Sequence, residues 1–211
     1  MVVCIAGSTG LTGSFLLEKL LHDSDVSKVY ALVRKPSSRR ADKLIEITFN
    51  GDFSKVELPE KADAFFCCLG TTIKKAGSQE AFRHVDVDLP KQLISIAEKT
   101  GAKSFVLQSS VGAQSDSSNF YLKCKGEVED GLKASSIPVK CTVRPSILAG
   151  PRKEFRLGEK IGLVFMQLLG PLFIGKLKRY RAVHVERVAE TMLKAAKSQA
   201  PSWLIIESEA I

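Results

Sequence analysis

The chain begins with a glycine-rich turn between two apolar segments. The turn reads Gly7-Ser8-Thr9-Gly10-Leu11-Thr12-Gly13, the apolar run 2–6 precedes it, and leucines recur at helical spacing after it, at Leu16, Leu17, Leu20 and Leu21. This pattern predicts a strand, a tight turn and a helix. In such a unit the N–H groups of the turn and the positive end of the helix dipole face a phosphate, and glycine lets a pyrophosphate approach the backbone. We therefore expect residues 7–13 to form a nucleotide site.

Strand-like and helix-like segments alternate along the rest of the sequence. Further apolar runs lie at 28–33, 44–48, 64–69, 104–108, 139–143 and 204–206. Most are almost continuously apolar, which is typical of strands buried on both faces. Helical patterns cover 11–22, 78–100, 119–134 and 185–197, and Pro90 is expected to divide the second of these. This order predicts an α/β fold with a doubly wound parallel sheet, the Rossmann fold.

The length of 211 residues allows one good hydrophobic core. We expect a single domain over 1–211, in which residues from about 145 onward add a small substrate lobe. The apolar start is too short for a secretory leader, and the apolar stretch 162–175 is too short to cross a bilayer. A cytoplasmic enzyme is therefore expected. Segment 163–174 fits a packed helix or a pocket wall, and a partner or membrane contact stays open.

The net charge of +8 is spread along the chain. This spread favours weak, non-specific affinity for anions over a specific nucleic-acid function. The five cysteines have no metal-ligand spacing, so we expect reduced thiols in the core. The three histidines also lack ligand spacing, and no metal site is expected.

Basic residues follow the second predicted strand, at Arg34 and Lys35. At this place an NAD site usually has a carboxylate that binds the ribose 2′-hydroxyl. A guanidinium can instead hold a 2′-phosphate through two hydrogen bonds. We therefore expect NADP(H) rather than NAD(H) as the cofactor. The competing interpretation is that Arg34 is a solvated residue at the end of a strand.

Two further strand ends contain residues suited to the same cofactor. Asp52 follows the third predicted strand and is placed to accept a hydrogen bond from an adenine amino group, with Phe53 beside the ring. A simple turn is the alternative for Asp52. After the fourth strand, the small residue in Leu69-Gly70-Thr71 lets the backbone approach the nicotinamide ribose.

Tyr121 and Lys125 lie four residues apart on the predicted helix 119–134, so they share a face. A nearby ammonium favours the phenolate, so Tyr121 is a candidate acid for carbonyl reduction or base for alcohol oxidation. Lys125 is expected to hold the ribose hydroxyls. Ser109 and Ser110 end the fifth predicted strand, where ligands bind in parallel sheets, and can donate to a carbonyl oxygen. The alternative is that the two serines only turn the chain.

In this order, these motifs resemble the short-chain dehydrogenase/reductase superfamily, of the atypical or extended NAD(P)-binding type. The middle of the chain is similar to the oxidoreductase-like Tat-interacting proteins and their bacterial relatives, on Phe66-Cys67-Cys68-Leu69-Gly70-Thr71-Thr72, Val85-Asp86-Val87-Asp88 and Lys125-Gly126-Glu127-Val128-Glu129. The resemblance implies that Gly7, Gly10 and Gly13 hold the pyrophosphate, and that Arg34 holds the 2′-phosphate. It implies a catalytic triad of Ser110, Tyr121 and Lys125, with Ser110 favoured over Ser109.

The resemblance also places Arg144-Pro145-Ser146 beside the nicotinamide amide, with Ile147 as the main-chain donor. Asp86 departs from it, because extended relatives usually carry Asn there. The short C-terminal lobe counts against a nucleotide-sugar epimerase.

The sequence thus leads to an NADP(H)-dependent oxidoreductase acting on an unidentified carbonyl or alcohol. The alternative is an NADPH-binding regulator or sensor that acts through protein partners without turnover. The resemblance also allows a homodimer through the helix that carries Tyr121.

Overall fold

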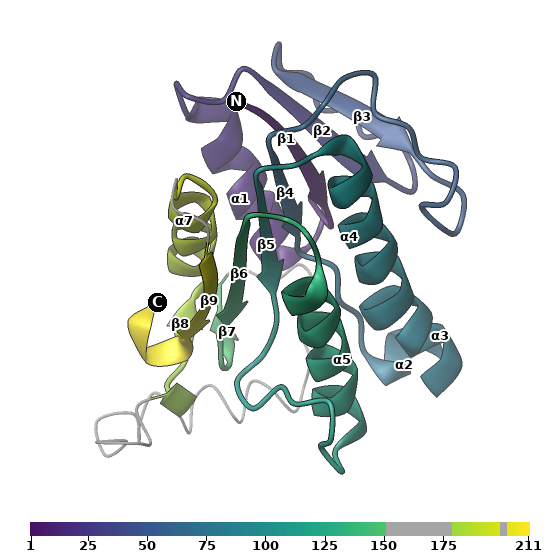
Figure 1. Ribbon diagram of the computed structural model, residues 1–211, viewed down its shortest axis with the longest axis vertical. Helices are drawn as coiled ribbons and strands as arrows, with labels where there is room; N and C mark the ends of the chain where they lie inside the picture. The colour runs from purple at the N-terminus through teal and green to yellow at the C-terminus, as the bar shows by residue number, and fades with distance from the viewer. Residues whose placement is uncertain (151–178, 199–201) are drawn as a thin grey trace.

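Seven parallel strands form the central sheet of the computed structural model, which describes residues 1–150, 179–198 and 202–211 (Figure 1). The strands lie in the order β3-β2-β1-β4-β5-β6-β9. Their bounds are β1 (Val2–Ala6), β2 (Lys28–Val33), β3 (Leu44–Thr48), β4 (Ala64–Cys67), β5 (Ser104–Gln108), β6 (Val139–Arg144) and β9 (Ser202–Glu207). The order reverses between β1 and β4, so the doubly wound Rossmann fold predicted from the sequence is confirmed.

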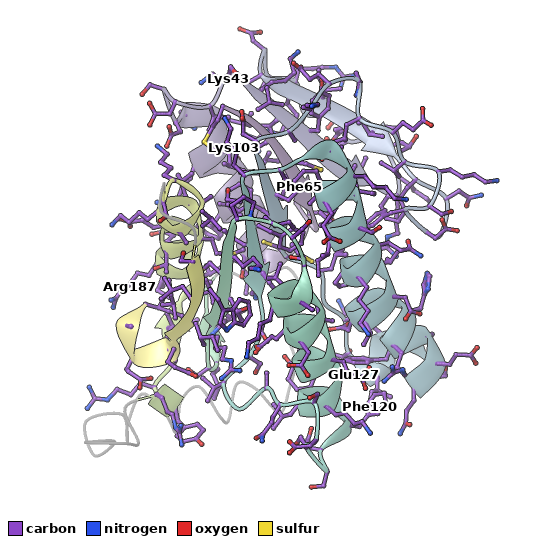
Figure 2. All side chains as sticks on the ribbon, viewed as in Figure 1. Lys43, Phe65, Lys103, Phe120, Glu127 and Arg187 are labelled. Carbon is purple, nitrogen blue, oxygen red and sulfur yellow. The ribbon has the colours of Figure 1, made fainter. Side chains whose placement is uncertain are left out.

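Burial explains which apolar runs became central strands. Every residue of β4 is buried, as are most residues of β1, β2 and β5, because helices cover both faces of these strands. The edge strand β3 instead has no fully buried residue. Phe65 shows the depth of this core: it lies between the sheet and α4 (Leu89–Thr100), parallel to the ring of Phe105 (Figure 2).

The helices divide between the two faces of the sheet. On one face α1 (Leu11–His22) packs beside α7 (Val185–Ala196), through Leu16, Leu20, Val188 and Met192. The other face is covered by α4 and α5 (Phe120–Ala134), with α3 (Gln79–Arg83) beyond them (Figure 1). The short α2 (Ile73–Ala76) follows β4.

The helical segment 78–100 contains two α-helices, as predicted, and Pro90 stands at the start of the second, but the chain stays helical between them. α3 continues into α4 through one π-helical turn, η1 (His84–Asp88), and Pro90 lies in the first turn of α4. Proline is tolerated in a first turn, where its missing N–H costs little. The wider π-turn before it keeps the chain helical past the proline ring.

The cysteines are free thiols, as expected, and four of the five are buried. Cys67 belongs to the core cluster on the α4 and α5 side, whereas Cys68 packs against the cluster on the α1 and α7 side. Adjacent residues at the end of a strand therefore point to opposite faces, as the two-residue period of a strand predicts.

Part of the chain after residue 145 returns to the main sheet. β7 (Leu148–Ala149) and β8 (Val183–His184) pair in a small separate sheet. After α7, β9 completes the central sheet, and a short 3-10 turn, η4 (Ser208–Ala210), follows it. The apolar segment 163–174 and most of the expected substrate lobe lie outside the described residues. Of the helices in the described ranges, none has the length and apolar character needed to cross a membrane.

Candidate functional site

A cavity of about 580 Å³ lies at the carboxyl ends of β1, β4 and β5, where the strand order reverses. Three groups of predicted residues line it, from the β1–α1 turn, the segment after β4, and β5 with α5. They are Thr9, Gly10, Leu11, Thr12, Leu69, Gly70, Thr71, Ser109, Tyr121 and Lys125. The structure therefore brings the expected nucleotide turn and the expected reactive side chains to one cavity.

The glycines of the β1–α1 turn pack against other backbone. Gly7 has φ of +89°, and a Cβ there would lie 2.6 Å from the carbonyl carbon of Cys68. A Cβ at Gly13 would lie 2.0 Å from the carbonyl oxygen of Gly7. The N–H of Gly10 donates to that same oxygen at 3.0 Å. No larger residue fits either position, and the tight turn directs the N-terminus of α1 toward the cavity.

The segment after β4 forms the opposite wall of the cavity. The N–H of Thr71 donates to Oδ2 of Asp86 at 2.8 Å. A Cβ at Gly70 would be in ordinary van der Waals contact with both side chains, 3.7 Å from Oδ1 of Asp86 and 3.8 Å from Nζ of Lys125. The backbone of this segment therefore passes directly over these two side chains.

The first two turns of α5 carry Tyr121 and Lys125. The side chain of Asn119 caps this helix by accepting a hydrogen bond from the N–H of Leu122 at 3.1 Å. Nζ of Lys125 lies 5.9 Å from the centroid of the Tyr121 ring, and the edge of that ring contacts Phe82. Tyr121 is 39% exposed at the cavity, whereas Lys125 is almost fully buried.

Lys125 forms an ion pair with Asp86, the residue at which the sequence departs from its resemblance. The two charged atoms lie 2.8 Å apart, and the side chains are 8% and 0% exposed. Burial alone would lower the pKa of Lys125, but its interactions with Asp86, and to a smaller extent with Tyr121 and Cys67, together raise the pKa. Lys125 is therefore charged at neutral pH.

The two serines after β5 occupy different environments. Ser109 lines the cavity, and its Oγ is buried without a hydrogen-bond partner among the described residues. The hydroxyl of Ser110 donates to the carbonyl of Val111 at 3.5 Å, and Ser110 is not among the residues that line the cavity. The catalytic role expected of Ser110 stays a prediction.

Arg34 and Lys35 lie exposed directly after β2, as expected. Arg34 has no hydrogen-bond or ion-pair partner within the described ranges, whereas the nearby Arg39 pairs with Glu18 through both of its terminal nitrogens. The guanidinium of Arg34 is therefore available to an anion, unlike that of Arg39.

Asp52 and Phe53 are engaged elsewhere. The ring of Phe53 is 1% exposed and contacts Phe49 edge-on, with the centroids 4.6 Å apart. It is a core residue, so the expected contact with an adenine ring is wrong. The carboxylate of Asp52 accepts a hydrogen bond from the N–H of Ser54 at 2.7 Å, and the two bonds from Ser54 lower its pKa. The alternative of a turn residue fits this geometry.

The segment after β6 is also held by the fold. The guanidinium of Arg144 pairs with Glu129 on α5 and Glu207 on β9, through contacts of 2.5 and 2.9 Å. Its side chain is therefore committed to the packing of α5 and does not face the cavity, contrary to expectation. The carbonyls of Pro145 and Ile147 accept hydrogen bonds from Val111 and Val183. Neither Pro145 nor Ile147 lines the cavity, and the donor role of Ile147 stays a prediction.

Sequence reasoning did not assign six residues of the cavity wall to the site: Ser14, Cys68, Lys75, Asp86, Gln108 and Leu148. Cys68 directly precedes Leu69, and Gln108 directly precedes Ser109. Their position at the ends of β4 and β5 could therefore have predicted that they line the site. Nothing in the sequence pattern placed Lys75 or Leu148 at the cavity. Within the described residues, no group of three or more His, Cys, Asp or Glu side chains is arranged to hold a metal ion.

The fold and the cavity define an NAD(P)-binding Rossmann-type domain. The model of the protein family described as NAD(P)H-binding matches residues 7–199, and the chain belongs to that family. Its relatives include the protein FMP52 of Meyerozyma guilliermondii, 30% identical over 218 residues that cover 100% of this chain and 94% of that protein. They also include the protein HTATIP2 of Rattus norvegicus, 34% identical over 217 residues, with coverage of 99% and 87%. The family is oxidoreductase-like.

Solved structures of low sequence identity share the fold. The human epimerase family protein SDR39U1, in a structure with NADPH, matches with a TM-score of 0.65 at 19% identity over 98% of this chain and 74% of that one. A putative NAD-dependent epimerase/dehydratase from Bacillus halodurans matches with a TM-score of 0.67 at 19% identity, over 99% and 97%.

The cytoplasmic location expected from the sequence is wrong in the light of these relatives. The FMP52 proteins of Meyerozyma guilliermondii, Aspergillus niger and Emericella nidulans are named as mitochondrial. The expectation rested on apolar segments, which report secretory leaders and membrane spans. Apolar segments give no information on targeting signals of other kinds, such as those that import receptors recognise.

Proposed function

We propose that the protein is an NADP(H)-dependent oxidoreductase of the short-chain dehydrogenase/reductase type that acts on a carbonyl or alcohol. One observation carries the proposal: a single cavity is lined both by the β1–α1 glycine turn and by Tyr121 with Lys125. Carbonyl reduction by a dinucleotide needs this combination, a cradle for the cofactor phosphates and a proton donor for the substrate oxygen.

The cavity residues fit such a cofactor. The turn has no room for a Cβ at Gly7 or Gly13, and buried hydroxyl oxygens of Thr12 and Ser109 lack partners among the described residues. Residues 7–13 would hold the pyrophosphate. Leu69, Gly70 and Thr71 would lie along the nicotinamide ribose, whose hydroxyls Lys125 would bind.

The end of β2 supports NADP(H) over NAD(H). Arg34 and Lys35 stand where a carboxylate would select the free 2′-hydroxyl. A carboxylate would repel a 2′-phosphate, whereas the guanidinium of Arg34 can bind it through two charge-assisted hydrogen bonds.

When bound at this cavity, NADPH would supply the hydride that reduces the carbonyl carbon of the substrate. The hydroxyl of Tyr121 gives its proton to the carbonyl oxygen, and in the reverse direction it takes the proton of the alcohol. The ammonium of Lys125 favours the phenolate that remains on Tyr121. The buried hydroxyl of Ser109, which lines the cavity, would donate a hydrogen bond to the substrate oxygen.

The test is NADPH oxidation over a panel of aldehydes and ketones, with Tyr121→Phe compared with wild type. Loss of a positioned proton donor costs about a hundredfold to ten-thousandfold in rate, and we expect a loss in this range. Tyr180→Phe is the matched control, because Tyr180 is similarly exposed but does not line the cavity. NADPH binding without turnover of any panel member would contradict the proposal and favour a cofactor sensor.

Alanine variants of Ser109 and Ser110 distinguish the roles of the two serines. Ser109→Ala is expected to lower kcat, and Ser110→Ala is expected to leave it within a few-fold, because Ser109 alone lines the cavity. The reverse ranking would support the role that the sequence resemblance implies for Ser110.

A further inference from the structure

The buried carboxylate of Asp86 contacts two segments that line the cavity, the segment after β4 and the helix α5. Asp86 lies in the π-helical turn η1, and its side chain is 0% exposed. One of its oxygens accepts a hydrogen bond from the N–H of Thr71 in the segment after β4. The other lies 2.8 Å from Nζ of Lys125 on α5. Asp86 thus contacts both the backbone proposed to follow the nicotinamide ribose and the lysine proposed to bind that ribose.

We propose that Asp86 is a positioning residue that keeps the buried Lys125 charged and directed at the cofactor, while it fixes the Thr71 segment beside it. This inference rests on the proposed function, since it takes the cavity to be the site of a pyridine dinucleotide.

The charge of Asp86, and not only its hydrogen bond, is needed for this role. A buried ammonium without a partner loses its proton rather than remain charged in a poorly solvated site. An amide at position 86 could still accept the Thr71 hydrogen bond, but it would not compensate the charge of Lys125. A neutral lysine would donate only weaker, uncharged hydrogen bonds to ribose hydroxyls.

The other groups that face Lys125 do not replace Asp86. Tyr121 faces it from α5, Cys67 and Cys68 from the end of β4, and Lys75 lines the same cavity from α2. Burial raises the pKa of Cys67 to about 11 and also raises the pKa of Cys68, so both thiols are neutral below pH 9. Among these groups, Asp86 is the carboxylate in contact with the ammonium.

The test is the affinity for NADP⁺, measured by calorimetry from pH 5.5 to pH 9 on wild type and Asp86→Asn. The amide retains an acceptor for Thr71 but loses the charge. We expect the ratio of the Asp86→Asn dissociation constant to that of wild type to rise by about tenfold over this range, as a charge-assisted hydrogen bond becomes a neutral one. The ratio to wild type cancels the pH dependence of NADP⁺ binding that comes from all other titrating groups.

Two further variants separate charge from structure. In Asp86→Asn/Lys125→Arg the guanidinium stays charged at every pH used, so the extra pH dependence should disappear. Asp88→Asn is the matched control in the same turn; its carboxylate is 54% exposed and lies 3.7 Å from His84, and we expect a profile like that of wild type. If Asp86→Asn fails to fold, Asp86→Ser offers a smaller neutral acceptor, for which the same rise is expected.

The outcomes distinguish this inference from the proposed function. A wild-type protein that is folded but binds neither NADP⁺ nor NADPH would contradict the proposed function. A wild-type protein that binds NADP⁺, together with a constant affinity ratio for Asp86→Asn or Asp86→Ser across the pH range, would overturn the role of Asp86 alone.

Discussion

Arg34 is the residue at which the choice of cofactor can be tested by one substitution. It lies exposed after β2 without a partner among the described residues. We expect Arg34→Ala to weaken NADPH binding by about 1.5–3 kcal/mol, the contribution of a charge-assisted hydrogen bond, and to leave NADH binding unchanged. Fluorescence titration with both cofactors measures this difference.

Arg40→Ala is the matched control for Arg34→Ala. Its guanidinium donates to the carbonyls of Ser37 and Arg39 in the same loop. An equal loss of NADPH and NADH affinity in Arg34→Ala would show that Arg34 does not read the 2′-phosphate.

The ion pair between Asp86 and Lys125 also predicts how stability depends on pH. With the pKa of Lys125 raised in the folded protein, its stabilising contribution is present at neutral pH and is lost only as the pH rises through that pKa. In Asp86→Asn burial lowers the folded pKa instead, so the unfolded state binds more protons. Relative to wild type, the free energy of unfolding of Asp86→Asn should therefore rise between pH 6 and pH 10.

Urea unfolding of both proteins at several pH values measures this change. At neutral pH, removal of one partner of a buried pair costs about 3–5 kcal/mol. Lys125→Met/Asp86→Asn should recover part of that loss, because neither charge is then left alone. A pH profile of Asp86→Asn parallel to that of wild type would show that the charge state of Lys125 does not depend on Asp86.

At the scale of elements, the β5–α5 connection is packed tightly on the helix that carries Tyr121 and Lys125. The N–H of Gln114 donates to the carbonyl of Leu122, and Arg144 donates to the carbonyl of Ala113 at 3.1 Å. A Cβ at Gly126 would lie 2.2 Å from the backbone of Gln114. The connection and the helix are therefore positioned together, and with them Ser109 and Tyr121.

This packing reverses the usual effect of alanine in a helix. Gly126→Ala should destabilise the protein by about 1–3 kcal/mol, the cost of overpacking, although alanine is the better helix former. Gly131→Ala in the same helix meets only the side chain of Lys91 at 3.8 Å, and we expect it to stabilise by up to about 1 kcal/mol. Thermal unfolding compares the two, and a stabilised Gly126→Ala would contradict the tight packing.

At the scale of the whole molecule, the sheet and the nucleotide turn could be predicted from the sequence because local chemistry determines them. Strands buried on both faces are apolar throughout, and the turn has no room for a Cβ at Gly7 or Gly13. Helical spacing predicted that Tyr121 and Lys125 share a face, and the strand-end serines and the family resemblance supported their assignment to the site. Because the carboxyl ends of parallel strands meet at one edge of the sheet, the β1–α1 turn, the segment after β4, and β5 with α5 line one cavity.

The missed or wrong assignments depend on contacts between distant segments. The partner of Asp86 lies 39 residues away on another helix. Phe53 follows β3 by five residues and Arg144 ends β6, but Phe53 is buried in the core and Arg144 pairs with Glu129 and Glu207. The π-helical turn that joins α3 to α4 just before Pro90 is another detail that the sequence pattern did not predict.

The measurement that tests the central claim most directly is calorimetric titration of the folded wild-type chain with NADPH and with NADH. We expect one NADPH site per chain and weaker binding of NADH, because only NADPH has the 2′-phosphate that Arg34 can bind. Equal affinity for the two would contradict the choice of cofactor. No heat from either cofactor, on protein with a cooperative unfolding transition, would contradict the site itself.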